Sequence, residues 1–311
     1  MEDFPRTLLD FEQRFATEQA CSDYLFRFRW PEGFRCPRCG HPKAWGRKRG
    51  VYRCAHCRFE AHVTAGTIFQ DTRKPLRLWF RAIWHLTSQK YGANALGLMR
   101  VLDMGCYQTA WTWLHKLRRA MVRPGRDRLS GTVQTDEIYI GGRKRGKRGR
   151  GAEGKALVVI MAELKEGKTG RIRLKRVTDA SGASLEGAVR EGVEPGSTVQ
   201  TDEWGGYERL SELGYAHEII GRNAALGKNV LPKVNRVASL LKRWLLGTYQ
   251  GGVHFSHLDY YLDEFTFRFN RRTSHSRGKL FYRLVEQAMA IGPVLGHNIR
   301  GGIHSPVKLS P

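Results

Sequence analysis

The sequence has no long hydrophobic run and is poor in acidic residues. Its 311 residues include 29 Asp and Glu against 53 Lys and Arg, which gives a formal net charge of +24. No apolar stretch approaches the roughly 20 residues that a transmembrane helix needs. The N-terminus, MEDFPRTLLDFEQRF, is acidic and amphipathic, so it lacks the pattern of a signal peptide. We therefore expect a soluble, cytoplasmic protein with no membrane partner.

The excess of basic residues indicates a polyanionic partner. Lys and Arg recur among aromatic residues and along predicted helices, and they are not confined to one tail. A folded chain with this charge most simply binds nucleic acid. The alternative is a protein that is basic for another reason, such as association with ribosomes. Hydrophobic residues make up 41% of the chain, which is enough for a core, and the length predicts two or three domains.

Cysteine is also scarce, but four of the six cysteines form a pattern. The segments CPRCG and CAHC place Cys36 and Cys39, then Cys54 and Cys57, in two C-x-x-C turns with 14 residues between them. Each turn can present two thiolates to one tetrahedral ion, so we expect a structural Zn²⁺ site in a zinc ribbon. The alternative is a pair of disulfides, which a reducing cytosol disfavours.

Residues 75–121 show helical periodicity. LRLWFRAIWHL carries apolar residues at helical spacing, and Trp and Leu residues form one stripe of CYQTAWTWLHKLRRAM. A short helix, a turn and a helix with a basic end favour a helix-turn-helix, in which Lys116, Arg118 and Arg119 would contact DNA. The alternative is a plain three-helix unit whose Trp stripe belongs to the core.

From residue 132 onward, strands and helices alternate. We expect strands in TVQTDEIYIGG, KALVVIMAEL, RIRLKRV, STVQTDEWGGY and YAHEII, and helices in ASLEGAVREGV, YERLSELG and NRVASLLKRWLLGTY. This order is typical of an RNase H-like fold with a mixed five-stranded sheet. The whole chain is then an α/β protein with an N-terminal helical segment (1–33), a zinc ribbon (34–70), a helical DNA-binding region (71–121), a linker (122–131), an RNase H-like domain (132–285) and a C-terminal tail (286–311).

The hexapeptide TVQTDE occurs twice, at Thr132–Glu137 and at Thr198–Glu203. In an RNase H-like fold, the first and fourth strands lie side by side, so Asp136 and Asp202 would face each other. Two neighbouring carboxylates repel each other unless cations lie between them, so we expect them to bind Mg²⁺ or Mn²⁺. Two such ions can activate a water or a 3′-hydroxyl against a phosphodiester. The alternative is that both segments are surface strand ends.

A third ligand is expected from a helix beyond the last strand. Asn235 lies 33 residues after Asp202, and Lys242 follows seven residues later on the same helical face. The Asn carbonyl can ligate a hard cation, and Lys242 can hold a phosphate. Alternatively, Asn235 is a helix N-cap and Lys242 a solvated side chain. The rival third ligand is Glu264, unless it only pairs with Arg268.

A strongly basic segment follows the first TVQTDE strand. GGRKRGKRGRG holds six basic residues at positions 143–150. Beside an active site, such a loop can contact the phosphate backbone of DNA; the alternative is a solvated loop. The DNA-contact candidates in this segment are Arg143, Lys144, Arg145, Lys147 and Arg148.

Taken together, these segments resemble one family. CPRCG, YRCAHCRFEAHVTAGTIF, QTDEIYIGG, QTDEWGGY, LKRWLLGTY and YLDEFTFRFNRR occur in this order. They resemble the bacterial insertion-sequence transposases that have an N-terminal transposase zinc ribbon and a DDE-type catalytic domain. The resemblance covers roughly residues 10–285.

The resemblance implies a metal-dependent DNA transposase that cuts and joins the ends of a mobile element. The family's first two acids fall on Asp136 and Asp202. Its third position varies among Glu, Asn and His and is followed seven residues later by Lys, which matches Asn235 and Lys242. Many relatives have Glu followed by Ser-Phe-Trp at this point, whereas this chain reads NRVAS. Glu264 then has a structural role.

The partners implied are double-stranded DNA, as terminal repeats and as target, and further copies of the chain when DNA is bound. A nucleoid-associated protein without a small-molecule substrate is expected. One rival hypothesis is an RNase H-like nuclease that hydrolyses DNA and never joins it. The other is a DNA-binding regulator with an impaired active site, and Asn235 is the residue that favours it.

Overall fold

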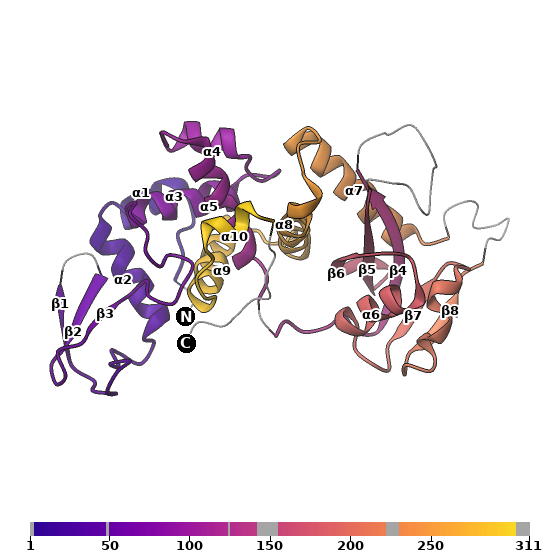
Figure 1. Ribbon diagram of the computed structural model, residues 1–311, viewed down its shortest axis with the longest axis horizontal. Helices are drawn as coiled ribbons and strands as arrows, with labels where there is room; N and C mark the ends of the chain where they lie inside the picture. The colour runs from indigo at the N-terminus through magenta and orange to yellow at the C-terminus, as the bar shows by residue number, and fades with distance from the viewer. Residues whose placement is uncertain (1–2, 48–49, 124, 142–154, 222–229, 303–311) are drawn as a thin grey trace. The chain divides into compact units, whose positions relative to one another are not determined.

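The computed structural model describes residues 3–47, 50–123, 125–141, 155–221 and 230–302. Contacts between residues divide the chain into two compact units (Figure 1). The first unit comprises Met1–Pro124 and Thr273–Pro311, and the second comprises Gly125–Arg272. None of the helices in these described ranges is both long enough and apolar enough to cross a membrane.

Helices form most of the first unit. Thr7 and Thr17 begin the first two helices, because each side-chain oxygen accepts an N–H of the following turn. Ser276 caps α9 in the same way. The helices of this unit are α1 (Leu8–Arg14), α2 (Glu18–Arg29), α3 (Leu76–Ser88), α4 (Ala95–Val101), α5 (Tyr107–Ala120), α9 (Arg277–Ala290) and α10 (Gly296–Arg300).

An aromatic cluster joins α9 to the N-terminal helices. The ring of Phe281 on α9 lies 5.4 Å from that of Phe11 and 5.6 Å from those of Phe15 and Phe80, measured between centroids. Phe281 is fully buried. The chain therefore returns to the first unit after Arg272, whereas the sequence predicted an RNase H-like domain that extends to residue 285. The difference arises because α9 buries its apolar face against α3.

A small antiparallel sheet holds the cysteine turns. Its strands are β1 (Ala44–Arg47), β2 (Val51–Cys54) and β3 (Glu60–His62), in the order β1-β2-β3. Tyr52 on β2 packs against α2, with its ring centroid 4.8 Å from that of Phe26 and 5.4 Å from that of Trp30. Helix α2 thus covers the face of the sheet that bears Tyr52.

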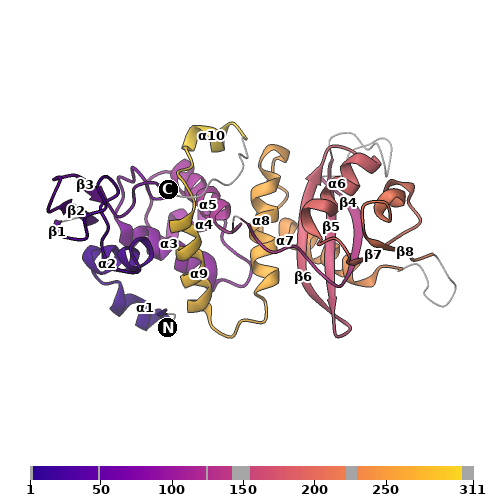
Figure 2. The same ribbon diagram turned by 90° about the horizontal axis from the view of Figure 1, so that it is seen from below.

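The second unit contains a five-stranded mixed sheet, as expected from the sequence. Its order is β6-β5-β4-β7-β8, which can be followed in Figure 2. Strands β4, β5 and β6 pair antiparallel, and β4, β7 and β8 pair parallel. The strands are β4 (Thr132–Ile140), β5 (Ala156–Lys165), β6 (Lys168–Val177), β7 (Thr198–Thr201) and β8 (Ala216–Ile219).

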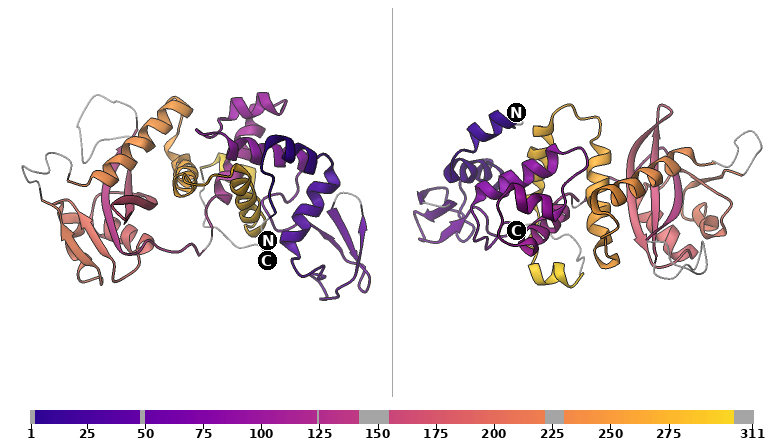
Figure 3. Two further views of the ribbon diagram at one scale, coloured as in Figure 1. Left: turned by 180° about the vertical axis from the view of Figure 1, so that it is seen from behind. Right: turned by 90° about the horizontal axis from the view of Figure 1, so that it is seen from above.

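Helices cover both faces of this sheet (Figures 1 and 3). One face packs Val133 and Val159 against α6 and η2, and the other packs Ile138 and Ile160 against α7 and α8. Since side chains alternate along a strand, Asp136 projects to the α7 face together with Ile138. The covering elements are α6 (Gly182–Gly192), η2 (Gly205–Leu210), α7 (Pro232–Tyr249), η3 (Phe255–His257) and α8 (Leu258–Asn270).

Candidate functional site

The two copies of TVQTDE lie beside each other in register. Strand β4 pairs in parallel with β7, and Thr132, Val133 and Gln134 stand opposite Thr198, Val199 and Gln200. The prediction that these two strands are neighbours is therefore confirmed. Asp136 lies on β4, and Asp202 follows directly after the end of β7. Neighbouring strands are about 4.8 Å apart, so the repeat places its two aspartates at equivalent positions of adjacent chain segments.

A row of hydrogen bonds crosses the sheet just before these aspartates. The N–H of Lys233 donates to Gln134 Oε1 (3.0 Å), and Gln134 Nε2 donates to Gln200 Oε1 (3.3 Å). Gln200 Nε2 in turn donates to Glu218 Oε2 (2.9 Å). The row connects β4, β7 and β8 to the first turn of α7. Sequence reasoning missed these residues, although the glutamine at the third position of both hexapeptides was a visible signal.

The two aspartates accept backbone hydrogen bonds, and Asp136 differs from Glu137, which follows it. Asp136 Oδ1 accepts the N–H of Glu137 (2.8 Å), and Asp202 Oδ1 accepts the N–H of Trp204 (3.1 Å). Glu137 lies on the other face, where its Oε2 accepts the hydroxyl proton of Tyr207 (3.1 Å). Burial, followed by the charges of Glu137, Asp136 and Asp202, raises the pKa of Tyr207 well above its usual value. Tyr207 is thus a neutral hydroxyl group that donates to the Glu137 carboxylate.

Helix α7 carries the other two predicted residues. It begins at Pro232, a favourable first helical residue, and Leu231 precedes it as the N-cap. The N–H of Asn235 donates to the carbonyl of Leu231 (3.0 Å). Asn235 is therefore inside the helix, and the alternative that it is the N-cap is wrong. Asn235 is half-buried and Lys242 is exposed. One continuous helix keeps their seven-residue spacing on a common face.

Glu264 has a different environment. Its side chain is 0% exposed on α8, and its carboxylate accepts hydrogen bonds from Arg268 Nε (2.8 Å) and from the Tyr249 hydroxyl (3.2 Å). A buried carboxylate must be paired to remain charged. These partners come from α8 itself and from the end of α7, so the geometry favours the structural role over that of a metal ligand.

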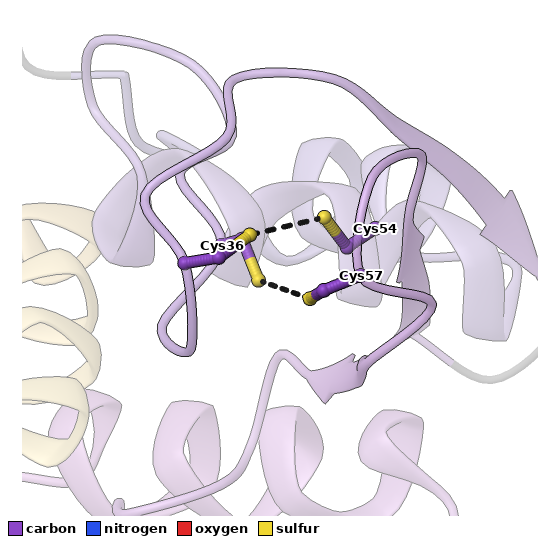
Figure 4. A group of neighbouring side chains, drawn as sticks. Cys36, Cys54 and Cys57 are labelled. Atoms are coloured by element: carbon purple, nitrogen blue, oxygen red, sulfur yellow. Dashed lines mark hydrogen bonds between the residues drawn. The ribbon is translucent and has the colours of Figure 1, made fainter.

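The four cysteines of the ribbon meet at one point. The sulfur atoms of Cys36, Cys39, Cys54 and Cys57 lie within 4.8 Å of one another, and the sulfur of Cys36 is 3.6 Å from that of Cys57. Figure 4 shows the labelled sulfurs turned toward each other from two loops. Four converging thiols are the donor set of a closed tetrahedral Zn²⁺ site. The expected zinc-ribbon cluster is confirmed.

The electrostatics of the thiols also suit a dication. Desolvation opposes ionisation of Cys54, but hydrogen bonds from the N–H groups of Cys57 and His56 prevail and lower its pKa to about 6. The N–H of His41 lowers the pKa of Cys39, but desolvation and the hydrogen bonds with the other thiols prevail and raise it to about 12. Adjacent thiolates therefore compete for ionisation, and a zinc ion would stabilise all four.

The predicted DNA contacts on α5 need correction. Arg118 and Arg119 are only 1% and 4% exposed. Arg118 donates to the carbonyl of Ala93 (3.4 Å) and is hydrogen-bonded to His115 Nδ1 (3.3 Å), so its guanidinium is used within the helical region. Lys116 is half-buried, and desolvation lowers its pKa. The basic candidates Arg143, Lys144, Arg145, Lys147 and Arg148 lie outside the described residues.

The tryptophans of this region belong to its core. Trp113 stacks on Trp79 of α3, with 3.7 Å between ring centroids and 12° between ring planes. Both side chains are buried. Of the predicted stripe of Trp111, Leu114 and Leu117, the two leucines are buried and Trp111 is half-buried, so the structure supports the three-helix packing unit. Tyr107 and Gln108, at the other end of α5, are exposed.

Parts of both units match families of known proteins. Residues 16–60, which include all four ribbon cysteines, match the model of the transposase zinc-ribbon domain. Residues 128–270, which include all elements from β4 to α8, match the model of the ISXO2-like transposase domain. A Halobacterium salinarum protein described as an uncharacterized protein in transposable element ISH50 is 28% identical over 277 residues. The match covers 82% of this chain and 91% of that relative.

Proposed function

This chain belongs to the insertion-sequence transposases that combine a transposase zinc ribbon with an ISXO2-like transposase domain, and we propose that it cleaves and joins the DNA ends of a mobile element. The observation that carries the proposal is the in-register pairing of the two TVQTDE segments. It gives two carboxylates at equivalent positions of adjacent chain segments, Asp136 on β4 and Asp202 just after β7, a donor arrangement suited to hard divalent cations.

Asp136 and Asp202 would hold Mg²⁺ or Mn²⁺, with the side-chain oxygen of Asn235 as the third ligand. When bound, these ions would polarise the scissile phosphodiester and favour ionisation of the attacking water or 3′-hydroxyl. Lys242, exposed on the same face of α7 as Asn235, would hold a phosphate of the DNA end. Gln134 and Gln200 would keep the two strands and the start of α7 in register.

DNA recognition is assigned to the first unit. The net charge of +24 attracts the negatively charged DNA duplex. The ribbon and helical region would bind the terminal repeats. Joining requires two ends to be held together, so we propose that the chain acts as a homo-oligomer on DNA. Lys116 and the basic residues at 143–148 remain candidate contacts with the DNA backbone.

The test is cleavage and joining of the DNA ends that flank this gene, with Mn²⁺ or Mg²⁺. We expect Asp202→Ala and Asn235→Ala to lower the rate about a thousandfold or more, because metal-ion stabilisation of the transition state is worth several kcal/mol. Glu264→Gln, compared at equal folded concentration, should retain most of the activity. A dead Glu264→Gln beside an active Asn235→Ala would instead assign the third ligand to Glu264.

The same assay separates the rival functions. The resemblance implies a carboxylate at the position of Asn235 in many relatives, and an amide oxygen binds a hard cation more weakly than a carboxylate, so a catalytically impaired protein is one rival. A wild-type chain that binds the ends and never cuts them would identify a DNA-binding regulator. Cleaved but never joined products would identify a nuclease.

A further inference from the structure

The sheet of the zinc ribbon has a covered face and an open face. Tyr52 lies on the covered face, opposite Gly46 on β1 and Ala61 on β3. Side chains alternate along each strand, so the neighbouring register row of Trp45, Arg53 and Glu60 lies on the other face. Trp45 is 51% exposed there.

Trp45 carries a cation on its ring. The Cζ atom of Arg58 lies 4.9 Å from the ring centroid, and the Arg58 side chain is exposed. A guanidinium over an indole ring is attracted by the ring's quadrupole. In this position its N–H groups remain available to a phosphate, which arginine can bind through two parallel hydrogen bonds.

Arg58 has a backbone conformation that is unusual for a residue other than glycine. The N–H of Arg58 donates to the carbonyl of Cys54 (3.2 Å), as the N–H of Gly40 donates to that of Cys36 (2.8 Å). The two cysteine turns therefore have the same geometry, and both of their last residues are left-handed, with φ of 74° at Gly40 and 60° at Arg58. A left-handed conformation costs an L-residue about 1–2 kcal/mol and costs glycine little. The chain has an arginine where glycine would be more stable, which points to a use for its side chain.

The surroundings of the pair are basic. Lys43 and Arg47 flank Trp45 on the same loop and strand and are exposed. The carboxylate of Glu60 is 3.5 Å from the guanidinium of Arg47. Arg47 therefore partly neutralises the negative charge of Glu60. The open face thus presents an aromatic ring with an excess of positive charge, which complements a phosphate backbone.

We infer that the open face of the ribbon sheet is a docking surface for duplex DNA, with Arg58 contacting a phosphate and Trp45 positioning the Arg58 guanidinium. The choice of DNA as the ligand rests on the proposed function. Contacts with phosphates carry no sequence information, so this surface strengthens binding to any duplex and orients the ribbon on it.

The test measures binding of the full chain to two labelled duplexes, the element end and a scrambled sequence of equal length, by fluorescence anisotropy over a range of salt. Arg58→Gly relieves the left-handed strain, so its zinc content and melting temperature should be at least those of wild type. We expect its Kd to rise about fivefold to tenfold on both duplexes near 0.1 M salt. The slope of log affinity against log salt should become shallower by about one, as for one lost phosphate contact.

Two further variants make the test specific. Arg27→Ala removes the same charge from α2, the helix on the covered face, where the Arg27 side chain is 67% exposed and pairs with Asp3. It should leave the salt slope at the wild-type value. Trp45→Ala should weaken binding less than Arg58→Gly, and the double variant should be no weaker than Arg58→Gly alone, because the ring acts through the guanidinium.

The outcomes separate a failure of this docking surface from a failure of the proposed function. If wild type binds both duplexes and Arg58→Gly retains the wild-type Kd and salt slope with zinc bound, the docking surface is wrong and the transposase proposal is untouched. If the Trp45 and Arg58 effects add, the positioning role of Trp45 is wrong. If wild type binds neither duplex, the proposed function itself fails.

Discussion

Asp202 and Glu264 show how the surroundings of a carboxylate determine its role. Asp202 follows the end of β7 and accepts one backbone N–H from Trp204. Glu264 is fully buried and is paired with Arg268 and Tyr249. A charge buried with its partner stabilises the fold only while the pair is intact. The segment around Glu264 is acidic and resembles a motif of the transposase family. The contacts of Glu264, however, are those of a core residue.

Glu264→Gln should therefore reduce stability more than any surface substitution of the same kind. It removes the carboxylate charge 2.8 Å from the Arg268 guanidinium, which is 13% exposed, and breaking a buried pair costs about 3–5 kcal/mol. The measurement is urea unfolding followed by circular dichroism. The control is Glu286→Gln, which breaks the partly exposed pair with Arg283 (2.8 Å) and should cost less than about 1 kcal/mol. Equal midpoints for the two variants would contradict a structural role for Glu264.

At the scale of elements, the row of glutamines joins the two aspartate-bearing segments to α7. Each glutamine accepts one hydrogen bond and donates another, so the row runs without interruption from the N–H of Lys233 to Glu218. A slip of β7 by one residue would move its side chains to the opposite face. The glutamines oppose such a slip and hold the start of the helix that carries Asn235.

Gln134→Met, which keeps the side-chain size, should affect both stability and metal dependence. It leaves the N–H of Lys233 and the amide oxygen of Gln200 without this partner, which costs about 1–3 kcal/mol. Because α7 is then less firmly placed, half-maximal cleavage should need more Mn²⁺, and high Mn²⁺ should restore the rate. Gln19→Met on α2, whose amide donates to Asp23 at an exposed site, is the matched control. An unchanged Mn²⁺ requirement in Gln134→Met would show that the row has no positioning role.

At the scale of the whole molecule, two units with separate cores share one chain. The main chain passes between them at Pro124–Gly125 and again at Arg272–Thr273. The zinc ribbon is part of the first unit, and the mixed sheet forms the second. Each unit has its own hydrophobic interior, which is the condition for independent folding.

Removal of zinc should therefore destabilise one unit and spare the other. Structural zinc sites contribute free energy directly to folding, so a chelator or Cys57→Ser should lower the melting temperature of the first unit. The transition of the second unit should stay in place, as recorded by scanning calorimetry in Mg²⁺-free buffer. Zinc analysis should find about one ion per chain, since four thiolates close one tetrahedral site. A common downward shift of both transitions would show that the units fold as one.

Local patterns were sufficient for much of this protein. The two C-x-x-C turns, the five strands and the helix bearing Asn235 could be predicted because cysteine spacing and hydrophobic periodicity act within short segments. The order of strands and helices, typical of an RNase H-like fold, also indicated that the two TVQTDE strands are neighbours. Spacing could not show the row through Gln134 and Gln200, since its partners come from four elements that meet only in the folded sheet.

Other properties followed from tertiary contacts alone. Arg118 and Arg119 lie at the basic end of a predicted helix, which suggested exposed side chains. The packing of α5 instead buries both guanidinium groups. Residues after Arg272 return to the first unit because Phe281 completes an aromatic core begun near the N-terminus. Trp45 and Arg58 are 13 residues apart in the sequence and meet on the open face of the ribbon. Which side chains are buried depends on which surfaces of distant segments pack together. The composition and spacing within one segment do not determine that packing.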